Sequence, residues 1–168
     1  MRRLVLALIA AAALPLVISP PGLAAPCWSP PVAGVVVDPF REPPCPYCAG
    51  NRGLEYGVSG SSTVRAVESG VVAWAGVVAG IRYVVVRHAD GWRATYGRLS
   101  ATSLHTGDVV LAGRVVGRVA RGFHFGLRRG DRYIDPAPFL GESVGRRRLV
   151  PLDGRAPRPA PPPRLRCA

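Results

Sequence analysis

Short apolar segments separated by glycine fill the middle of this 168-residue chain and most constrain how it folds. The segments are rich in valine, tyrosine and tryptophan, which favour strands, and no window shows the periodicity of a full helix. The 20 glycines and 18 prolines require many turns. We therefore predict an all-β domain whose strands occupy residues 34–37, 63–66, 70–75, 82–87, 93–96, 114–121 and 124–128.

One hairpin is predicted in detail. Residues 82–87 and 93–96 flank the sequence Asp90-Gly91, which suits a type I′ turn because both central residues of that turn tolerate a positive φ. The segment 136–140 is the one place where a single helical turn is expected.

The first 24 residues have the pattern of a secretory signal peptide. Arg2 and Arg3 precede an apolar run over residues 4–18, and small residues follow up to Ala24, where we expect cleavage. The run is shorter than the roughly 20 residues that a spanning helix needs. An uncleaved anchor is the alternative, and a lipoprotein is disfavoured because a proline precedes Cys27. The sequence predicts a secreted or cell-envelope protein with no transmembrane span after cleavage.

The chain has four cysteines, namely Cys27, Cys45, Cys48 and Cys167. An oxidising compartment favours disulfides, and the sequence leaves all three possible pairings open. Cys45 and Cys48 also have redox or zinc-knuckle spacing. A redox motif is disfavoured because this pair does not open a helix after a strand, and a knuckle needs a second ligand pair.

The net charge of +12 is unevenly distributed. All basic residues are arginine, which excludes lysine-based chemistry. Residues 146–168 combine arginines with prolines, so we predict a disordered or polyproline-like tail after a domain at 25–145. Such a tail suits anionic wall polymers or lipid headgroups, and a solvated tail without a partner is the alternative. Nucleic acid is not expected as a partner, because the basic run carries no interleaved aromatic residues.

Three stretches, taken together, resemble one family. The first is Asn51-Arg52-Gly53-Leu54-Glu55 with residues 61–66. The second runs from 70–72 to 85–88 and on to Tyr96-Gly97-Arg98-Leu99. The third runs from 107–110 to Phe123-His124-Phe125-Gly126 and 133–136. Their order and spacing resemble the lysostaphin-type, or LytM-like, zinc endopeptidases that cut peptidoglycan cross-bridges. The resemblance covers roughly residues 30–140.

This resemblance implies a duplicated-hybrid-motif β-sandwich with a groove over one sheet. In that family a His-x-x-x-Asp pair and the second His of a His-x-His motif bind zinc. Three protein ligands leave a fourth position for a water molecule, whose pKa the metal lowers. The first His of His-x-His and the His of a Tyr-x-His-Leu segment assist that water.

The chain departs from this pattern at most of the family's functional positions. Asn51 replaces the first ligand, Glu55 replaces the aspartate, Arg98 replaces one catalytic histidine and Gly122 the other, while His124 matches the remaining ligand. A neutral amide is a poor zinc donor, and Arg98 brings a fixed positive charge. We therefore expect neither efficient hydrolysis nor a bound cofactor. Zinc held by Asn51, Glu55 and His124 in an active endopeptidase is the alternative.

Several residues carry two interpretations. Arg98 and Arg128 are candidates to bind carboxylates of a stem peptide, or are solvated surface groups. Trp74, Trp92 and Phe125 line a binding face or, more often for aromatic residues on strands, the core. Glu55 and His124 remain hydrogen-bonded without a metal as a structural relic, His88 is structural, and His105 lies in a turn.

Three functions are consistent with the sequence. The leading hypothesis is a non-catalytic envelope protein that holds peptidoglycan or controls a separate cell-wall hydrolase. The second is the zinc endopeptidase. The third is a structural secreted domain whose basic tail adheres to the wall.

Overall fold

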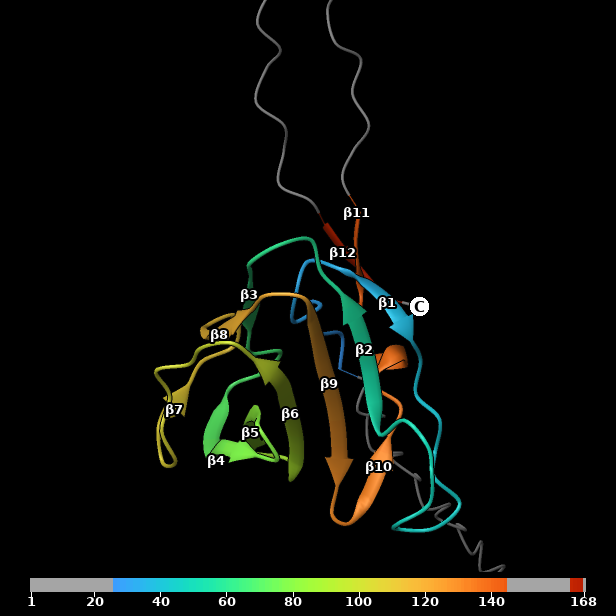
Figure 1. The fold of residues 1–168 in the computed structure, drawn as a ribbon. Helices are drawn as coiled ribbons and strands as arrows, with labels where there is room; N and C mark the ends of the chain where they lie inside the picture. Colours follow the sequence, from blue (N-terminus) through green and yellow to red (C-terminus); the bar gives the residue numbers. More distant parts are fainter. Residues whose placement is uncertain (1–25, 145–163, 168) are drawn as a thin grey trace, which may run out of the picture.

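The computed structural model describes residues 26–144 and 164–167 (Figure 1). The predicted signal peptide at 1–24 and residues 146–163 of the predicted tail lie outside the described residues. In the described part, no helix has the length and apolar character needed to cross a membrane.

The expectation of an all-β fold is confirmed. The strands are β1 (Val35–Asp38), β2 (Gly53–Gly57), β3 (Ser62–Arg65), β4 (Gly70–Val78), β5 (Ile81–His88), β6 (Trp92–Leu99), β7 (Val109–Val110), β8 (Val115–Val119), β9 (Gly122–Arg129), β10 (Arg132–Ile134), β11 (Glu142–Val144) and β12 (Arg164–Arg166). A single 3₁₀ turn, η1 (Ala137–Phe139), interrupts them within the expected segment 136–140.

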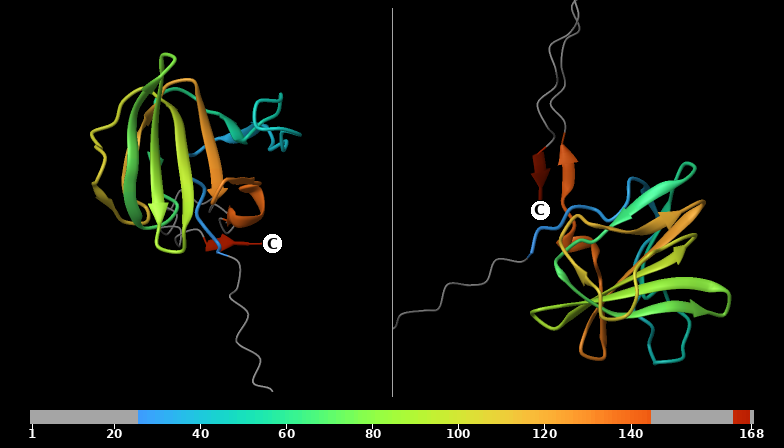
Figure 2. Two further views of the ribbon diagram at one scale, coloured as in Figure 1. Left: turned by 90° about the horizontal axis from the view of Figure 1, so that it is seen from below. Right: turned by 90° about the vertical axis from the view of Figure 1, so that its left-hand side faces the viewer.

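One large antiparallel sheet organises the fold. Its strand order is β1-β2-β9-β6-β5-β4-β7, with β10 added to β9. Two short ribbons, β3–β8 and β11–β12, complete the described part. Figure 2 shows β4, β5, β6 and β9 side by side. The late strand β9 thus lies between the early strand β2 and the central strand β6, which brings distant motifs together.

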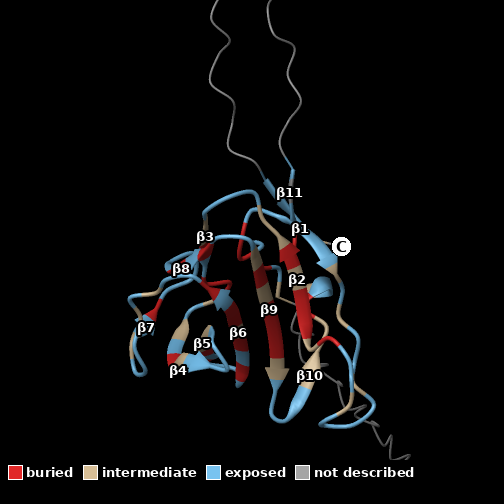
Figure 3. Cartoon of the chain, in the orientation of Figure 1, coloured by how far each residue is buried: buried red, intermediate tan, exposed pale blue. Residues whose placement is uncertain are grey.

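Alternation along the strands separates a core face from an outer face. Phe123, Phe125 and Leu127 of β9 are buried, as is Trp92 of β6. Val64 of β3, in the β3–β8 ribbon, is buried in the same core. Figure 3 shows the buried segments concentrated in β2, β6 and β9, whereas β1 is exposed. Trp92 and Phe125 are therefore core residues. Trp74 is 38% exposed and lies on the outer face.

Tyr96 anchors the core through one polar contact. Its hydroxyl accepts a hydrogen bond from the Val67 backbone N–H at 3.0 Å, and burial raises the pKa of this phenol. We expect Tyr96→Phe to lower the free energy of unfolding by about 1–3 kcal/mol, because the buried N–H loses its acceptor. Urea denaturation measures the loss. The control Tyr47→Phe alters a side chain that is 98% exposed, and a similar loss there would contradict the explanation.

The predicted hairpin is confirmed between β5 and β6, but its predicted turn type is wrong. Gly91 has a φ of +85° whereas Asp90 does not have a positive φ, so the two residues do not form a type I′ turn. The Gly91 N–H bonds to the His88 carbonyl at 3.1 Å, as in a type I turn followed by a left-handed glycine. The β4–β5 hairpin is the one with two positive φ values, 49° at Ala79 and 80° at Gly80.

The four cysteines form two disulfides, Cys27–Cys167 and Cys45–Cys48. The first joins the two ends of the described chain. The structure differs here from the expectation for the tail. Arg164–Arg166 belong to the predicted disordered tail, yet they form β12, which pairs with β11. The covalent tether of Cys167 and an ion pair between Arg166 and Glu142 at 3.1 Å hold this segment in place.

Candidate functional site

Glu55 and His124 lie directly opposite each other on paired strands. In the β2–β9 register Glu55 faces His124. Leu54 and Phe125 are buried in the core, so alternation places their neighbours Glu55 and His124 on the outer face of the sheet. His124 Nδ1 lies 2.7 Å from Glu55 Oε1, and both side chains are 18% exposed. The hydrogen bond expected for a metal-free relic is present.

A β-bulge brings Arg98 to the same carboxylate. The β5–β6 register pairs Tyr83 with Gly97 and Arg82 with Leu99, which leaves Arg98 as the extra residue. Its φ of +62° turns the chain locally, and bulges commonly redirect side chains in this way. Arg98 Nε then lies 3.3 Å from Glu55 Oε2. Arg98 therefore has a protein partner in Glu55, and its predicted role in binding the carboxylates of a stem peptide stays a prediction.

Asn51 is directed at the backbone. The residue is buried, with 7% of its surface exposed. Its Nδ2 donates to the carbonyls of Asp38 at 3.2 Å and Pro39 at 3.0 Å, and its Oδ1 accepts from the Gly53 N–H at 3.3 Å. Asn51 thus fastens the start of β2 to the end of β1. Its side-chain groups are engaged in holding the backbone.

Glycines lie beside His124 on the outer face, next to a groove that is lined by Tyr83, Thr95, His124, Arg128 and Tyr133. A Cβ at Gly97 would lie 2.6 Å from the Tyr83 ring, and one at Gly53 would lie 2.8 Å from Cε1 of His124. The rings of Tyr83 and His124 therefore occupy the space that side chains at positions 97 and 53 would otherwise fill. They border a hollow of about 300 Å³, together with Thr95 and Tyr133. The sequence alone does not identify Tyr83 and Tyr133 as residues of this hollow, because a tyrosine on a strand can lie on either face of the sheet.

Arg128 lies on the outer face of the sheet, and its predicted role in binding carboxylates stays a prediction. It is four residues beyond His124 on β9, and it lines the same hollow. Its guanidinium stands 5.0 Å from the centre of the Tyr133 ring, a cation–π distance, and its Nη2 bonds to Asp131 at 3.1 Å. The Arg52 guanidinium also lies near this ring, 5.5 Å from its centre.

The remaining histidines are placed as expected. His88 is buried, and its Nδ1 lies 2.9 Å from the Ser69 carbonyl oxygen. His105 lies in an exposed turn near Asp108. Neither reaches the groove residues in the described structure.

The residues at the family's zinc positions do not fit a zinc ion. Both carboxylate oxygens of Glu55 are already paired, one with His124 and one with Arg98. Asn51 is engaged by backbone groups. Within residues 26–144 and 164–167, no group of three or more His, Cys, Asp and Glu side chains is arranged to hold a metal.

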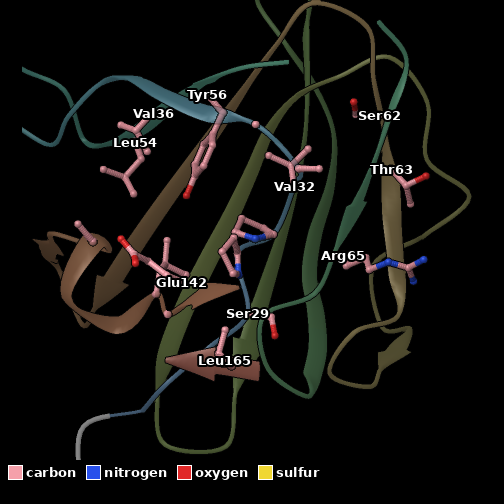
Figure 4. A pocket seen from close by; sticks show the side chains of 17 residues that line it. Ser29, Val32, Val36, Leu54, Tyr56, Ser62, Thr63, Arg65, Glu142 and Leu165 are labelled. Atoms are coloured by element: carbon pink, nitrogen blue, oxygen red, sulfur yellow. The ribbon is translucent and has the colours of Figure 1, made fainter. Parts of the chain in front are cut away.

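A hollow of about 1120 Å³ lies on the other side of β2. Figure 4 shows it lined by Leu54 and Tyr56, with Glu142 and Leu165 nearby. Burial raises the pKa of Tyr56 to about 12. None of the predicted catalytic, metal or ligand-binding residues lines this hollow, because alternation along β2 sends Glu55 to the opposite face.

The fold defines a LytM-like domain of the lysostaphin-type metallopeptidase class, and so does the order in which the family's functional positions follow one another along the chain. The chain belongs to peptidase family M23, whose model matches residues 49–136, just over half of the sequence.

Individual relatives cover parts of larger proteins. An uncharacterised protein of Haemophilus influenzae is 30% identical in an alignment 97 residues long, which covers 53% of this chain and 24% of that protein. The structure of Helicobacter pylori Csd3 has a TM-score of 0.61 and 27% identity over 70% of this chain and 34% of Csd3. A chain of the SpoIIQ–SpoIIIAH pore-forming complex shares the fold, with a TM-score of 0.58 and 22% identity over 70% of this chain and 92% of its own. This chain therefore spans about a quarter to a third of the first two relatives.

Proposed function

We propose that this protein is a non-catalytic LytM-like domain of the cell envelope that binds peptidoglycan or controls a cell-wall hydrolase. The arrangement around Glu55 carries the proposal. At the position of the family's metal-binding carboxylate, Glu55 is shared between His124 and Arg98. The guanidinium supplies a positive charge where catalysis would require a divalent cation, and a nearby fixed positive charge opposes cation binding.

The envelope location rests on three observations. The N-terminal segment resembles a signal peptide, all four cysteines pair as in oxidising compartments, and the family resemblance is to enzymes that act on peptidoglycan. The proposed organisation is a signal peptide at 1–24, a LytM-like domain from 25 and a basic segment from 146, whose last residues return to the domain as β12.

A regulatory role has support from one structural neighbour. The SpoIIQ chain was solved in complex with another protein, SpoIIIAH, so this fold can present a surface to a protein partner. A domain that controls a hydrolase would likewise bind it through one of its surfaces, either the groove or the edge of the sheet.

Metal content and wall binding test the proposal together. We expect near-zero zinc per chain by elemental analysis after dialysis against buffered zinc, no peptide release from peptidoglycan, and co-sedimentation of the disulfide-intact domain with isolated cell wall. One zinc per chain together with released peptides would instead establish the endopeptidase, with Asn51, Glu55 and His124 as ligands. Failure to bind both wall and wall hydrolases would leave only the structural role.

A further inference from the structure

Three arginines form a row across three adjacent strands. The β5–β6 register places Arg87 opposite Arg93, and the β6–β9 register places Arg93 opposite Arg128. Directly paired residues share a face of the sheet, so the three side chains project from the same outer face. Val71 of β4 lies opposite Arg87, and Tyr133 of β10 lies opposite Arg128. The row therefore has an apolar or aromatic residue at each end.

The row borders a hollow without acidic groups. This hollow, of about 640 Å³, is lined by the three arginines, by Trp74, Val71 and Val85, and by small polar residues including Thr95. Among the described residues Arg128 pairs with Asp131, whereas Arg87 and Arg93 form no ion pair. The Nε of Arg128 is buried and has no hydrogen-bond partner in the described structure.

This arrangement is unfavourable without a ligand. Neighbouring strands lie about 4.8 Å apart, so like charges directly opposite one another repel. A ligand with two or more carboxylates would relieve that repulsion and supply acceptors for guanidinium groups. Trp74 lies against Gly76, where a Cβ would be 2.7 Å from the indole, and its partly exposed ring offers apolar contact beside the charges.

We propose that the row Arg87–Arg93–Arg128 binds an acidic peptide carrying at least two free carboxylates. Trp74, Val71 and Val85 favour a peptide over a phosphate polymer, because they offer contacts for methyl and methylene groups beside the charges. The inference rests on the proposed function and deepens it, since it names peptide carboxylates as what the outer face of the sheet binds. It also assigns this role to Arg87 and Arg93, which are separate from the Glu55–His124 pair.

Fluorescence anisotropy tests the proposal with a labelled Ala-Glu-Ala-Glu-Ala peptide that keeps its terminal carboxylate. We expect Arg87→Gln/Arg93→Gln to weaken binding by about 10-fold or more, because two charge-assisted contacts are lost. The binding should also weaken as salt is raised, since Arg87 and Arg93 are exposed to solvent. The amidated Ala-Gln-Ala-Gln-Ala peptide should not bind.

A matched double variant controls for net charge. Arg118→Gln/Arg129→Gln also removes two positive charges, one from β8 and one from the other face of β9. Arg129 lies there 5.5 Å from the Trp92 ring centre. We expect this variant to retain peptide binding. Equal weakening in both double variants would overturn the proposal, because it would show a response to overall charge. Tighter binding of inorganic triphosphate than of the peptide would overturn the choice of ligand.

A second measurement requires no ligand. We expect Arg93→Gln to raise the Tm of the free protein by roughly 1–4 °C, because the central charge of the row is removed. Arg129→Gln should leave the Tm unchanged or lower it, since it removes the contact with Trp92. A lower Tm for Arg93→Gln would contradict the repulsion on which the argument depends.

The outcomes separate this inference from the proposed function. Wall co-sedimentation without peptide binding would overturn the arginine row while the proposed function stands. Peptide binding without co-sedimentation or hydrolase binding would overturn the proposed function and leave the acidic-peptide site.

Discussion

Zinc affinity should rise by at least about 10³-fold when Asn51→His, Glu55→Asp, Arg98→His and Gly122→His are combined with the native His124. Asn51→His and Glu55→Asp supply the family's imidazole and carboxylate ligands. Arg98→His removes the competing guanidinium, and Gly122→His restores the other catalytic histidine of the family. Position 122 has room, because a Cβ placed there would have the Tyr56 carbonyl oxygen as its nearest neighbour, at 3.6 Å. Position 98 has a φ of +62°, a conformation in which histidine is enriched. Competition with a chromophoric chelator measures the affinity.

Adding His124→Ala to the fourfold variant provides the control. We expect the gained zinc affinity to fall again, because one intended ligand is removed while the other substitutions stay. Asn51→His also breaks the hydrogen bonds to Asp38 and Pro39, so a thermal melt must show that the variant is folded. A folded fourfold variant without added zinc affinity would mean that these positions do not converge on one metal site.

Loss of the Cys27–Cys167 disulfide should cost about 2–5 kcal/mol of stability. The two cysteines are 140 residues apart, so the bond restricts a long loop of the unfolded chain. Cys27→Ser/Cys167→Ser removes it without changing volume greatly. Guanidinium denaturation under non-reducing conditions measures the difference from the native protein.

The second disulfide is the internal comparison. Cys45 and Cys48 are three residues apart, so their bond closes a short loop and removes less unfolded-state entropy. We expect Cys45→Ser/Cys48→Ser to destabilise less than Cys27→Ser/Cys167→Ser. Equal losses would argue that the long-range disulfide acts through native contacts at β11 and β12 and not through chain entropy.

Much of the sheet could be predicted from sequence, because the central strands are valine-rich and bounded by turn residues. β2 was not among the predicted strands. Its sequence Gly53-Leu54-Glu55-Tyr56-Gly57 contains two glycines and a glutamate, which have low strand propensity. Pairing with β9 and burial of Leu54 and Tyr56 override that preference. The family motif nevertheless identified the residues that meet there.

The site was less predictable than the fold. The meeting of Glu55 and His124 followed from the motif, but the ion pair with Arg98 depends on a β-bulge that no local pattern announces. The engagement of Asn51 by backbone carbonyls depends on where β1 ends. The arginine row depends on register between three strands, and sequence spacing alone does not specify register.

The disulfide between Cys27 and Cys167 also decides how the domain carries mechanical load. Tension applied through chain beyond these two residues would pass across the covalent bond, and the intervening sheet would lie outside the force-bearing path. Under oxidising conditions a pull applied at Cys27 and Cys167 would therefore not separate the strands between them. Reduction of that bond would place the load on β11 and β12 first, since this ribbon connects the last described strand to the rest of the fold.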